Sequence, residues 1–473
     1  MAVGSTNTFD LIVLGAGTGG YAAAFRGSQL GLRVALVDEG KIGGTCLHRG
    51  CIPTKALLES ASVAERMRHA SDFGIGGAGD PVIDYAKVAQ RRDMVVNRMW
   101  KGLGTLVKKY GVTWVEGRGR LDGAHKVRVK APDGSEVILE ATDVILATGS
   151  RVKSLPGITP DGVRIVTSDD VLQAGSLPKS AIVVGAGAVG VEFASFYHDM
   201  GASVTLLEYL PAIVPLEDAD VSKELERTFT RRGIKVVTSA RFDAASVVAG
   251  DDGVRVTVGP EGGPAEEVAA EVMLVATGRA TNVEDVGLET TAAEVDRGIV
   301  KVDGHMRTRE SHLYAIGDIV GGLQLAHTAA HEGIIAAHVI AGEADVHPMD
   351  YARQPRATYC RPEVASVGLT EQQCEAQGLP VKVGKVPFQA VGKAIIGGEY
   401  EGFAKVIGHA ETDETLGIHI IGPHATDLIA EASVALSLEA TPWEIGAATH
   451  AHPTLSEILG EAAMAVDGRS INF

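Results

Sequence analysis

The same order of apolar run, glycine-rich turn and helical segment occurs twice in this chain, 170 positions apart. In the first copy, the apolar residues 10–14 lead into Gly-Ala-Gly-Thr-Gly-Gly at residues 15–20; in the second, residues 181–184 lead into Gly-Ala-Gly-Ala-Val-Gly at residues 185–190. Five positions recur in order, with Gly15, Gly17, Gly20, Gly31 and Asp38 matched by Gly185, Gly187, Gly190, Gly201 and Glu208. Five ordered matches predict two dinucleotide-binding units in one chain.

Each copy has the parts that such a unit needs. The glycines permit a tight turn and a close approach of backbone to a pyrophosphate, which can rest on the N-terminus of the following helix. The apolar run after each helix ends in a carboxylate, Asp38 or Glu208, that can hold a ribose hydroxyl. A lone G-x-G-x-x-G is weak evidence, but here strand, turn, helix and acid stand at the expected spacing.

Two cysteines, Cys46 and Cys51, lie at a glycine-rich entry to a helix-like run at residues 56–59. A helix start presents unpaired N–H groups and the positive end of the dipole, which favours thiolate over thiol. The alternatives are half of a zinc site or an unused pair of core thiols. A zinc site needs a second pair of ligands at close spacing, and Cys360 and Cys374 do not supply one. We therefore expect a redox pair and no metal.

Composition narrows the class of protein. A length of 473 residues suggests about three domains. With 45% hydrophobic and 22% charged residues, a large core is expected and disorder is not. The net charge of −17 argues against a nucleic-acid or anionic-membrane surface. The start of the chain shows no targeting signal and four cysteines are too few for a secreted scaffold, so the cytoplasm is expected.

The motifs together resemble those of the FAD-dependent pyridine-nucleotide disulfide oxidoreductases over essentially the whole chain. Within that family, His-Ala-His-Pro-Thr at residues 450–454 resembles the branch that oxidises dihydrolipoamide with NAD more than the glutathione branch. The resemblance implies an α/β fold with two Rossmann-like dinucleotide-binding domains plus a C-terminal α+β dimerisation domain. The implied domains are an FAD domain at 1–150, an NAD domain at 151–280, a central segment at 281–350 that completes the FAD domain, and the dimerisation domain at 351–473.

The resemblance also implies roles for single residues. Cys51 would be the thiol beside the flavin and Cys46 the outer thiol that exchanges with substrate. Lys55 would lie near the flavin and pair with Glu192. The residues expected at FAD are Gly15, Gly17, Gly20, Asp38, Gly44, Thr45, Lys55, Thr148, Gly149, Asp318, Leu325, Ala326 and His327. Those expected at NAD are Gly185, Gly187, Gly190, Glu208 and Gly278.

By the same resemblance, His452 and Glu457 would be the acid–base pair. Disulfide exchange needs a thiolate and a group that manages the proton of the leaving thiol, and a histidine held by a carboxylate suits that task. Taken alone, His452 could equally cap a helix near Pro453. His450 has no evident carboxylate partner in the sequence and is expected to play a supporting part. Cys360 and Cys374 are expected to be ordinary thiols.

Two departures from the family pattern stand out. His48 and Arg49 occupy positions where many relatives carry Asn-Val, which adds a positive charge between the cysteines and is expected to lower the thiolate pKa or shift the redox potential. Asp38 replaces the commoner glutamate and shortens the reach to the adenosine ribose by one methylene. Neither change removes a required group.

The runner-up activities within the family are glutathione reduction and mercuric reduction. An NADPH enzyme would place arginines just after the second strand of the nicotinamide unit, but here Glu208 is followed by Tyr209 and Leu210 with no cation beside it. A mercuric reductase would carry another cysteine pair near its C-terminus. A subunit whose main role is docking in a multienzyme complex is the alternative from another class. The expected partners are a second copy of the chain and dihydrolipoamide or a lipoyl-domain protein, within a 2-oxo acid dehydrogenase complex.

Overall fold

The computed structural model describes residues 7–77, 79–260 and 262–473, which divide into two compact units. The first unit contains the residues up to Ala56, Ala89–Lys153 and Arg279–Tyr351. The second contains Leu57–Val88, Ser154–Gly278 and Ala352–Phe473. Each unit is therefore built from three separate stretches of chain, and the domain limits at 150, 280 and 350 stay a prediction.

The first unit is built on a seven-stranded sheet with the order β3-β2-β1-β6-β5-β4, in which β20 also pairs with β6. Its strands are β1 (Thr8–Leu14), β2 (Val34–Asp38), β3 (Thr113–Glu116), β4 (Arg118–Leu121), β5 (Lys126–Lys130), β6 (Glu136–Leu146) and β20 (Leu313–Ala315). The strands β3, β2, β1, β6 and β20 are parallel, whereas β4 and β5 are antiparallel additions. The parallel strands bring the turn after β1 and the segment after β20 to the same edge.

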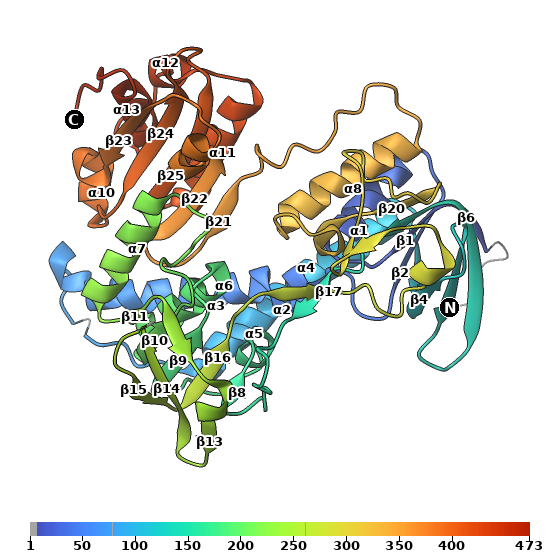
Figure 1. Ribbon diagram of the computed structural model, residues 1–473, viewed down its shortest axis with the longest axis horizontal. Coiled ribbons are helices and arrows are strands. Elements are labelled where there is room, and N and C mark those ends of the chain that lie inside the picture. The colour runs from blue at the N-terminus through green and yellow to red at the C-terminus, as the bar shows by residue number, and fades with distance from the viewer. Residues whose placement is uncertain (1–6, 78, 261) are drawn as a thin grey trace. The chain divides into compact units, whose positions relative to one another are not determined.

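Alternate residues of β1 face opposite sides of this sheet, as a strand buried on both faces requires. Leu11 and Val13 pack with the helices α1 (Thr18–Gln29) and α8 (Ala326–Ile340), and Ile12 and Leu14 pack on the other side with the antiparallel strands. The two helices lie side by side in Figure 1. Glycine at position 333 permits their close approach, because a Cβ there would lie only 2.6 Å from the Gly19 carbonyl oxygen.

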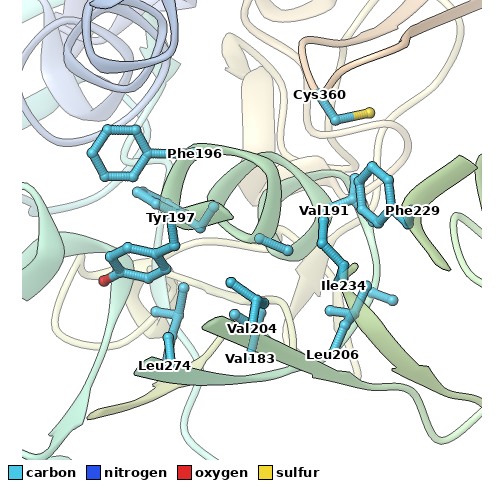
Figure 2. Close-up of a cluster of buried hydrophobic side chains, with 14 of the residues drawn as sticks. Val183, Val191, Phe196, Tyr197, Val204, Leu206, Phe229, Ile234, Leu274 and Cys360 are labelled. Atoms are coloured by element: carbon cyan, nitrogen blue, oxygen red, sulfur yellow. The ribbon is translucent and has the colours of Figure 1, made fainter. Parts of the chain in front are cut away.

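The nucleotide-binding part of the second unit repeats this design. Its parallel sheet has the order β11-β10-β9-β16-β8, with strands β8 (Ile165–Val166), β9 (Ser180–Val184), β10 (Ser203–Leu207), β11 (Lys235–Val237) and β16 (Val272–Val275). The helices α6 (Ala188–Asp199) and α7 (Ala219–Arg232) contribute Val191, Phe196 and Phe229 to a core with Val183 and Leu206 of the strands (Figure 2). These apolar side chains pack α6 and α7 against the parallel sheet.

The second unit also contains two antiparallel sheets. The smaller contains β12 (Ala240–Phe242), β13 (Val248–Gly250), β14 (Gly253–Pro260) and β15 (Glu266–Ala270). The larger has the order β21-β22-β25-β24-β23, with strands β21 (Arg356–Thr358), β22 (Glu363–Gly368), β23 (Val381–Pro387), β24 (Phe403–His409) and β25 (Thr415–Gly422). The helices α11 (Ala425–Ser437), α12 (Pro442–Ala447) and α13 (Glu457–Ala465) share its core.

The remaining helices and short strands connect these parts. The cysteine motif forms α2 (Gly44–Arg49) and the start of α3 (Cys51–Arg68), which is followed by η1 (Ala70–Phe73) and α4 (Tyr85–Lys109). The others are α5 (Ser168–Val171), α9 (Glu371–Ala376), α10 (Gly392–Gly397), η2 (Ala244–Ser246), η3 (Leu288–Thr290), η4 (Gly317–Val320), η5 (Phe388–Ala390), β7 (Ser150–Val152), β17 (Arg279–Thr281), β18 (Val295–Asp296) and β19 (Ile299–Val300). In the part of the chain that the structure describes, no helix combines the length and apolar character needed to cross a bilayer.

The predicted α/β class with two Rossmann-like halves and a C-terminal α+β region is confirmed. The strand β6 is continuous over Glu136–Leu146, and its first half pairs with β5 while its second half pairs with β1. Directly after it, β7 (Ser150–Val152) pairs with β17.

Candidate active site

The first glycine-rich turn joins β1 to α1 and leaves the start of the helix open. Gly17 caps α1 without a side-chain hydrogen bond, and a Cβ added there would meet no described atom within 4 Å. A Cβ at Gly15 would overlap the Ala147 carbonyl, and one at Gly20 would overlap the carbonyl oxygen of Gly15. Glycine at 15 and 20 is therefore required by the turn itself, whereas the open space at Gly17 suits a pyrophosphate on the helix N-terminus.

Asp38, at the end of β2, braces the same turn. Its Oδ2 accepts a hydrogen bond from the Ala16 backbone N–H at 2.7 Å, and its Oδ1 accepts one from the Gly40 N–H at 2.7 Å. A carboxylate oxygen has a second lone pair, so each oxygen retains an acceptor site for a ribose hydroxyl. The replacement of glutamate by aspartate thus leaves the brace intact, and the ribose contact stays a prediction.

The second glycine-rich turn, between β9 and α6, repeats these contacts. A Cβ at Gly190 would overlap the Gly185 carbonyl, and one at Gly187 would meet no described atom within 4 Å. Glu208 accepts from the Ala186 N–H at 2.6 Å and from the Leu210 N–H at 2.8 Å. The 170-residue repeat therefore extends to the hydrogen bonds of its acidic residues.

A cation does lie near Glu208, contrary to the expectation from the sequence. The Arg241 guanidinium stacks 3.7 Å from the centroid of the Tyr209 ring, and its Nη1 donates to the Tyr209 carbonyl at 2.7 Å. The start of β12 lies beside Glu208, because the Ala240 N–H donates to the Glu208 carbonyl at 2.7 Å. Arg241 is 33 positions from Glu208, so its place depends on this pairing.

The cysteine segment rests directly on the first glycine-rich turn. The Gly43 N–H donates to the Ala16 carbonyl at 2.8 Å, and Gly43 caps α2 with φ +117°. A Cβ at Gly44 would lie 2.6 Å from the Gly17 Cα. The backbone of α2 therefore approaches the expected pyrophosphate position closely, which is possible because residue 44 is glycine.

The Cys46 and Cys51 side chains hydrogen-bond to each other, and no disulfide joins them in the described residues. Cys46 lies within α2, and Cys51 is the first residue of α3. The hydrogen bond with Cys51, together with burial, raises the pKa of the Cys46 thiol well above its usual range, although Thr18 and Lys55 act in the opposite direction. The helix start alone therefore does not set the pKa of Cys46, because the contact with the Cys51 sulfur acts in the opposite direction.

His48 is turned toward the backbone. Its Nε2 bonds the Ile42 carbonyl at 2.9 Å, which fixes the ring on the segment that precedes α2. Arg49 is exposed. The effect of these two residues on the thiols stays a prediction.

The turn at Gly317 and Asp318 follows β20 at the same sheet edge. Asp318 accepts a hydrogen bond from the Ser150 hydroxyl, and the Arg279 Nε lies 3.7 Å from Asp318 Oδ2. Arg279 also donates to Ser150, to the hydroxyl at 2.6 Å and to the carbonyl at 2.8 Å. The sequence pointed to Asp318 but not to Ser150 or Arg279, which lie 168 and 39 positions away from it in the chain.

Two threonine hydroxyls are buried at the dinucleotide sites without a partner in the described residues. Thr328 lies in the first turn of α8, after the expected FAD residues Leu325, Ala326 and His327. Thr277 lies beside the second glycine-rich turn, since a Cβ added at Gly185 would lie 3.3 Å from the Thr277 Cα. The next residue, Gly278, has φ +117°. Buried polar atoms normally have hydrogen-bond partners, so both hydroxyls fit sites at which a bound molecule completes the bonding. No motif in the sequence points to either hydroxyl.

Thr148 and Gly149, both expected at FAD, lie just beyond the end of β6 at Leu146. The Thr148 Oγ1 donates to the Asn282 carbonyl at 2.8 Å, and the Asn282 side chain donates back to the Thr148 carbonyl at 2.9 Å. Gly149 has φ +68°. The Thr148 hydroxyl is thus used within the first unit, and Thr45, which lies in α2, is the other threonine expected at FAD.

His452 and Glu457 form the expected pair. The His452 Nδ1 and the Glu457 Oε1 are 2.9 Å apart, and the Glu457 Oε2 accepts from the Thr454 N–H at 2.9 Å. The hydrogen bond with His452 lowers the pKa of Glu457. The His452 side chain is 78% exposed, so its ring is open to solvent.

His450 has a carboxylate partner, which the sequence did not reveal. Its Nε2 lies 2.6 Å from the Glu431 Oε1 on α11. The two residues are 19 positions apart, and they meet because α11 packs in the same core as the segment before α13. The second unit therefore contains two histidine–carboxylate pairs near residue 450.

The remaining expected pairings join residues of different units. Lys55 belongs to the first unit and Glu192 to the second, and the same holds for Cys46 and His452. Within its own unit, Glu192 is buried and accepts from the Tyr359 N–H at 2.9 Å. The contacts between these partners stay predictions. Cys360 and Cys374 are both buried.

Comparison with known proteins decides the family. The model of the pyridine nucleotide-disulphide oxidoreductases matches residues 9–333, and that of their dimerisation domain matches residues 354–463. The chain belongs to this family.

Its relatives are similar over almost their full length. It is 46% identical to a dihydrolipoyl dehydrogenase of Bacillus subtilis, over 98% of this chain and 99% of that protein. It is 43% identical to a dihydrolipoyl dehydrogenase of Zymomonas mobilis, with the same coverage. Among solved structures, LpdA from Mycobacterium tuberculosis aligns with a TM-score of 0.89 and 30% identity, over 96% of this chain and 99% of that one.

The family is one of oxidoreductases that act on sulfur groups with FAD and NAD(H). The residues of this chain fit both cofactors. The uncapped helix starts at Gly17 and Gly187 each leave open space, and the unpartnered hydroxyls of Thr328 and Thr277 lie in the corresponding halves. Which side chain contacts which part of each cofactor stays a prediction.

Proposed function

We propose that this protein is a dihydrolipoyl dehydrogenase that works as a homodimer in the cytoplasm. It oxidises dihydrolipoamide, free or attached to a lipoyl-domain protein, and passes the electrons through Cys46, Cys51 and FAD to NAD. One observation carries the proposal: the segment that holds the hydrogen-bonded thiols of Cys46 and Cys51 packs directly against the first glycine-rich turn. Full-length similarity to relatives that bear this name supports it.

The first part of the reaction opens the oxidised cysteine pair. His452, oriented through Nδ1 by Glu457, accepts a proton at Nε2 from one thiol of the substrate. The resulting thiolate attacks the Cys46 sulfur, the Cys46–Cys51 bond breaks, and Cys51 departs with the electron pair as a thiolate. A mixed disulfide then joins the substrate to Cys46.

The second part releases the product. His452 gives its proton to Cys46 as that sulfur departs, and the second substrate thiol attacks the substrate sulfur of the mixed disulfide. A ring disulfide forms in the product, and the second substrate proton passes to His452. The chain is left with a Cys46 thiol, a Cys51 thiolate and a protonated His452. FAD supplies the two-electron transfer from this dithiol to NAD.

The partners follow from the same proposal. The match to the dimerisation domain at residues 354–463 supports a two-fold homodimer. A lipoyl group carried by a 2-oxo acid dehydrogenase complex would be the protein-bound substrate. A purely docking role is less well supported, because the chain carries both cysteines and a histidine–glutamate pair.

A steady-state assay tests the activity. Purified protein is given dihydrolipoamide with NAD, and in parallel oxidised glutathione with NADPH. We expect rapid turnover with the first pair only, loss of that activity in Cys46→Ser, and its retention in Cys360→Ser, which alters a buried cysteine outside the pair. Preferred turnover with oxidised glutathione and NADPH would contradict the proposal.

A further inference from the structure

Glu332 lies in the middle of α8, and each oxygen of its carboxyl group accepts one hydrogen bond. Its side chain is buried, with the residue 2% exposed. Its Oε2 accepts from the Gly317 backbone N–H at 2.6 Å, and its Oε1 accepts from the Tyr351 hydroxyl at 2.8 Å. One carboxyl thus ties α8 both to the turn after β20 and to the last residue of the first unit.

The turn that Glu332 holds is the one that carries Asp318. Gly317 has φ +75°, a backbone conformation that glycine adopts without strain, and Asp318 follows directly. Asp318 is itself fixed by Ser150 and faces Arg279. Displacement of the Glu332 carboxyl would therefore release the Gly317 N–H and loosen the segment that presents Asp318.

The charges around Glu332 come from few groups. Asp318 and Tyr351 act on it directly and in opposite directions: the negative charge of Asp318 disfavours ionisation of Glu332, whereas the hydrogen bond from the Tyr351 hydroxyl favours it. The opposing helix α1 meets α8 through glycine, and its one charged residue, Arg26, lies in its last turn. The other titratable residues of α8 are His327, His331 and His338.

Burial raises the pKa of Glu332 to about 7, and the negative charge of Asp318 adds to this, while the hydrogen bonds from Gly317 and Tyr351 oppose it. At neutral pH the group is therefore poised between its two protonation states. A further negative charge placed nearby favours the protonated state, because like charges disfavour ionisation.

We propose that Glu332 is a positioning residue of the FAD site, which holds the Gly317–Asp318 turn and takes up a proton when the bound flavin is reduced. The inference rests on the proposed use of FAD beside this turn. The flavin receives two electrons and its own proton from the dithiol reaction. One additional proton passes from solvent to the Glu332 carboxylate, and no bond forms between Glu332 and the cofactor. A residue that only braced the fold would take up no proton.

The test is the pH dependence of the flavin midpoint potential in full-length holoprotein. The variant Glu332→Gln keeps an amide oxygen for the Gly317 N–H and has nearly the same shape, but it cannot titrate. Both proteins carry Cys46→Ser and Cys51→Ser, so that the flavin is the one two-electron centre. Above pH 7, where most Glu332 side chains are ionised before reduction, we expect the protein with Glu332 to take up more protons per two electrons than the Gln variant, by up to one proton.

Two further variants sharpen the result. Asp143→Asn removes another buried carboxyl of the first unit, one that pairs with His312 rather than with the Asp318 turn, and it should leave proton uptake unchanged. Tyr351→Phe removes a donor that stabilises the Glu332 carboxylate, and it should move the additional uptake to higher pH. Equal uptake with and without Glu332 would overturn the inference.

If Glu332→Gln fails to retain FAD, the test is made with Tyr351→Phe instead. The inference is then overturned if the pH dependence of the flavin midpoint potential is the same in Tyr351→Phe as in the protein with Tyr351. The activity assay is separate. Absence of dihydrolipoamide oxidation in the unsubstituted protein, with the difference in proton uptake intact, would overturn the proposed function and leave the role of Glu332 standing.

Discussion

The Cys46 thiol and the Cys51 thiol share a hydrogen bond, and this contact raises the pKa of Cys46 rather than lowering it. Two sulfurs in such contact ionise as a pair, in which one carries the charge while the other keeps its proton. Cys51 stands at the first position of α3, where the helix dipole favours an anion, so the charge is expected on Cys51. Cys46, which keeps its proton, is the sulfur expected to exchange with substrate.

The first prediction separates the roles of the two thiols. Cys46→Ser should abolish dithiol oxidation but leave Cys51 able to lie beside the flavin as a thiolate. The oxidised variant should then show a long-wavelength charge-transfer absorption band, and Cys51→Ser should not. Absorption spectra of the two holoproteins check this, and a band that followed Cys46 would reverse the assignment.

The second prediction concerns the coenzyme. Glu208 can accept from both ribose hydroxyls and repels a 2′-phosphate, so kcat/KM for NAD should exceed that for NADP by at least roughly tenfold. Glu208→Ala should narrow the ratio. Comparable values for the two coenzymes in the unsubstituted protein would contradict the prediction.

Arg241 refines that expectation. Its guanidinium is held over Tyr209, directly after Glu208, where it can attract the 2′-phosphate of NADP. Arg241→Gln should therefore widen the preference for NAD, in the opposite direction to Glu208→Ala. Arg255, on the neighbouring strand β14, gives a matched control, because Arg255→Gln should leave the ratio unchanged.

Periodicity and local motifs predict the parts of this structure that depend on residues close in sequence. The glycine turns and the acids at the end of β2 and directly after β10 are examples, whereas the Glu457 partner of His452 was predicted from the resemblance to the family. The contacts that were missed join distant residues. Glu431 reaches His450 only when α11 is packed, and Arg241 reaches Tyr209 only when β12 pairs back onto the end of β10.

The pKa of Cys46 shows a second limit. A helix start is visible in the sequence, and its effect on a thiolate is predictable in sign. The orientation that lets Cys46 and Cys51 share a proton depends on the break between α2 and α3 at Gly50, which the spacing of two cysteines does not reveal. The same reason hides the unpartnered hydroxyls of Thr277 and Thr328, since burial depends on the whole sheet.

The third prediction compares the two histidine–carboxylate pairs. His452→Gln should lower kcat by about 10²–10⁴-fold, as removal of a general acid–base group does. Glu457→Gln should lower kcat less, since the His452 imidazole is still present and only the carboxylate that orients it is lost. Glu431→Gln alters the matched pair at His450 and should change kcat by no more than a few-fold. A larger loss in Glu431→Gln than in Glu457→Gln would place the proton-transfer role on His450.

The fourth prediction is a pH dependence of stability. The pKa of Glu332 rises from 4.5 to about 7 on folding, so between these values the folded protein keeps a proton that the unfolded chain has released. Stability therefore falls as pH rises through this window, by on the order of 3 kcal/mol for this group. Glu332→Gln should remove that part of the decline in free energy of unfolding between pH 5 and pH 8, measured with urea. The exposed Glu59 serves as control, and Glu59→Gln should follow the unsubstituted protein.

The last prediction is that the working site is shared by two subunits. Cys46 belongs to the first unit and His452 to the second, and a base must come within hydrogen-bond reach of the substrate thiol at Cys46. The resemblance to the family implies that the C-terminal region, which matches its dimerisation domain, forms the two-fold interface and lends His452 and Glu457 to the partner's site. Because a two-fold interface is self-complementary, each dimer would hold two such sites. One chain alone would then be inactive.

Hybrid dimers decide between a shared site and a site built from one chain. Cys46→Ser and His452→Gln subunits, each inactive as a homodimer, are mixed, dissociated and reassembled. If sites are shared, both lesions fall in one site of the hybrid and the other site is intact. Half of the dimers are hybrids after equal mixing, so activity should return to about a quarter of the unsubstituted level. If each site is built from a single chain, both sites of every hybrid are broken and the mixture stays inactive.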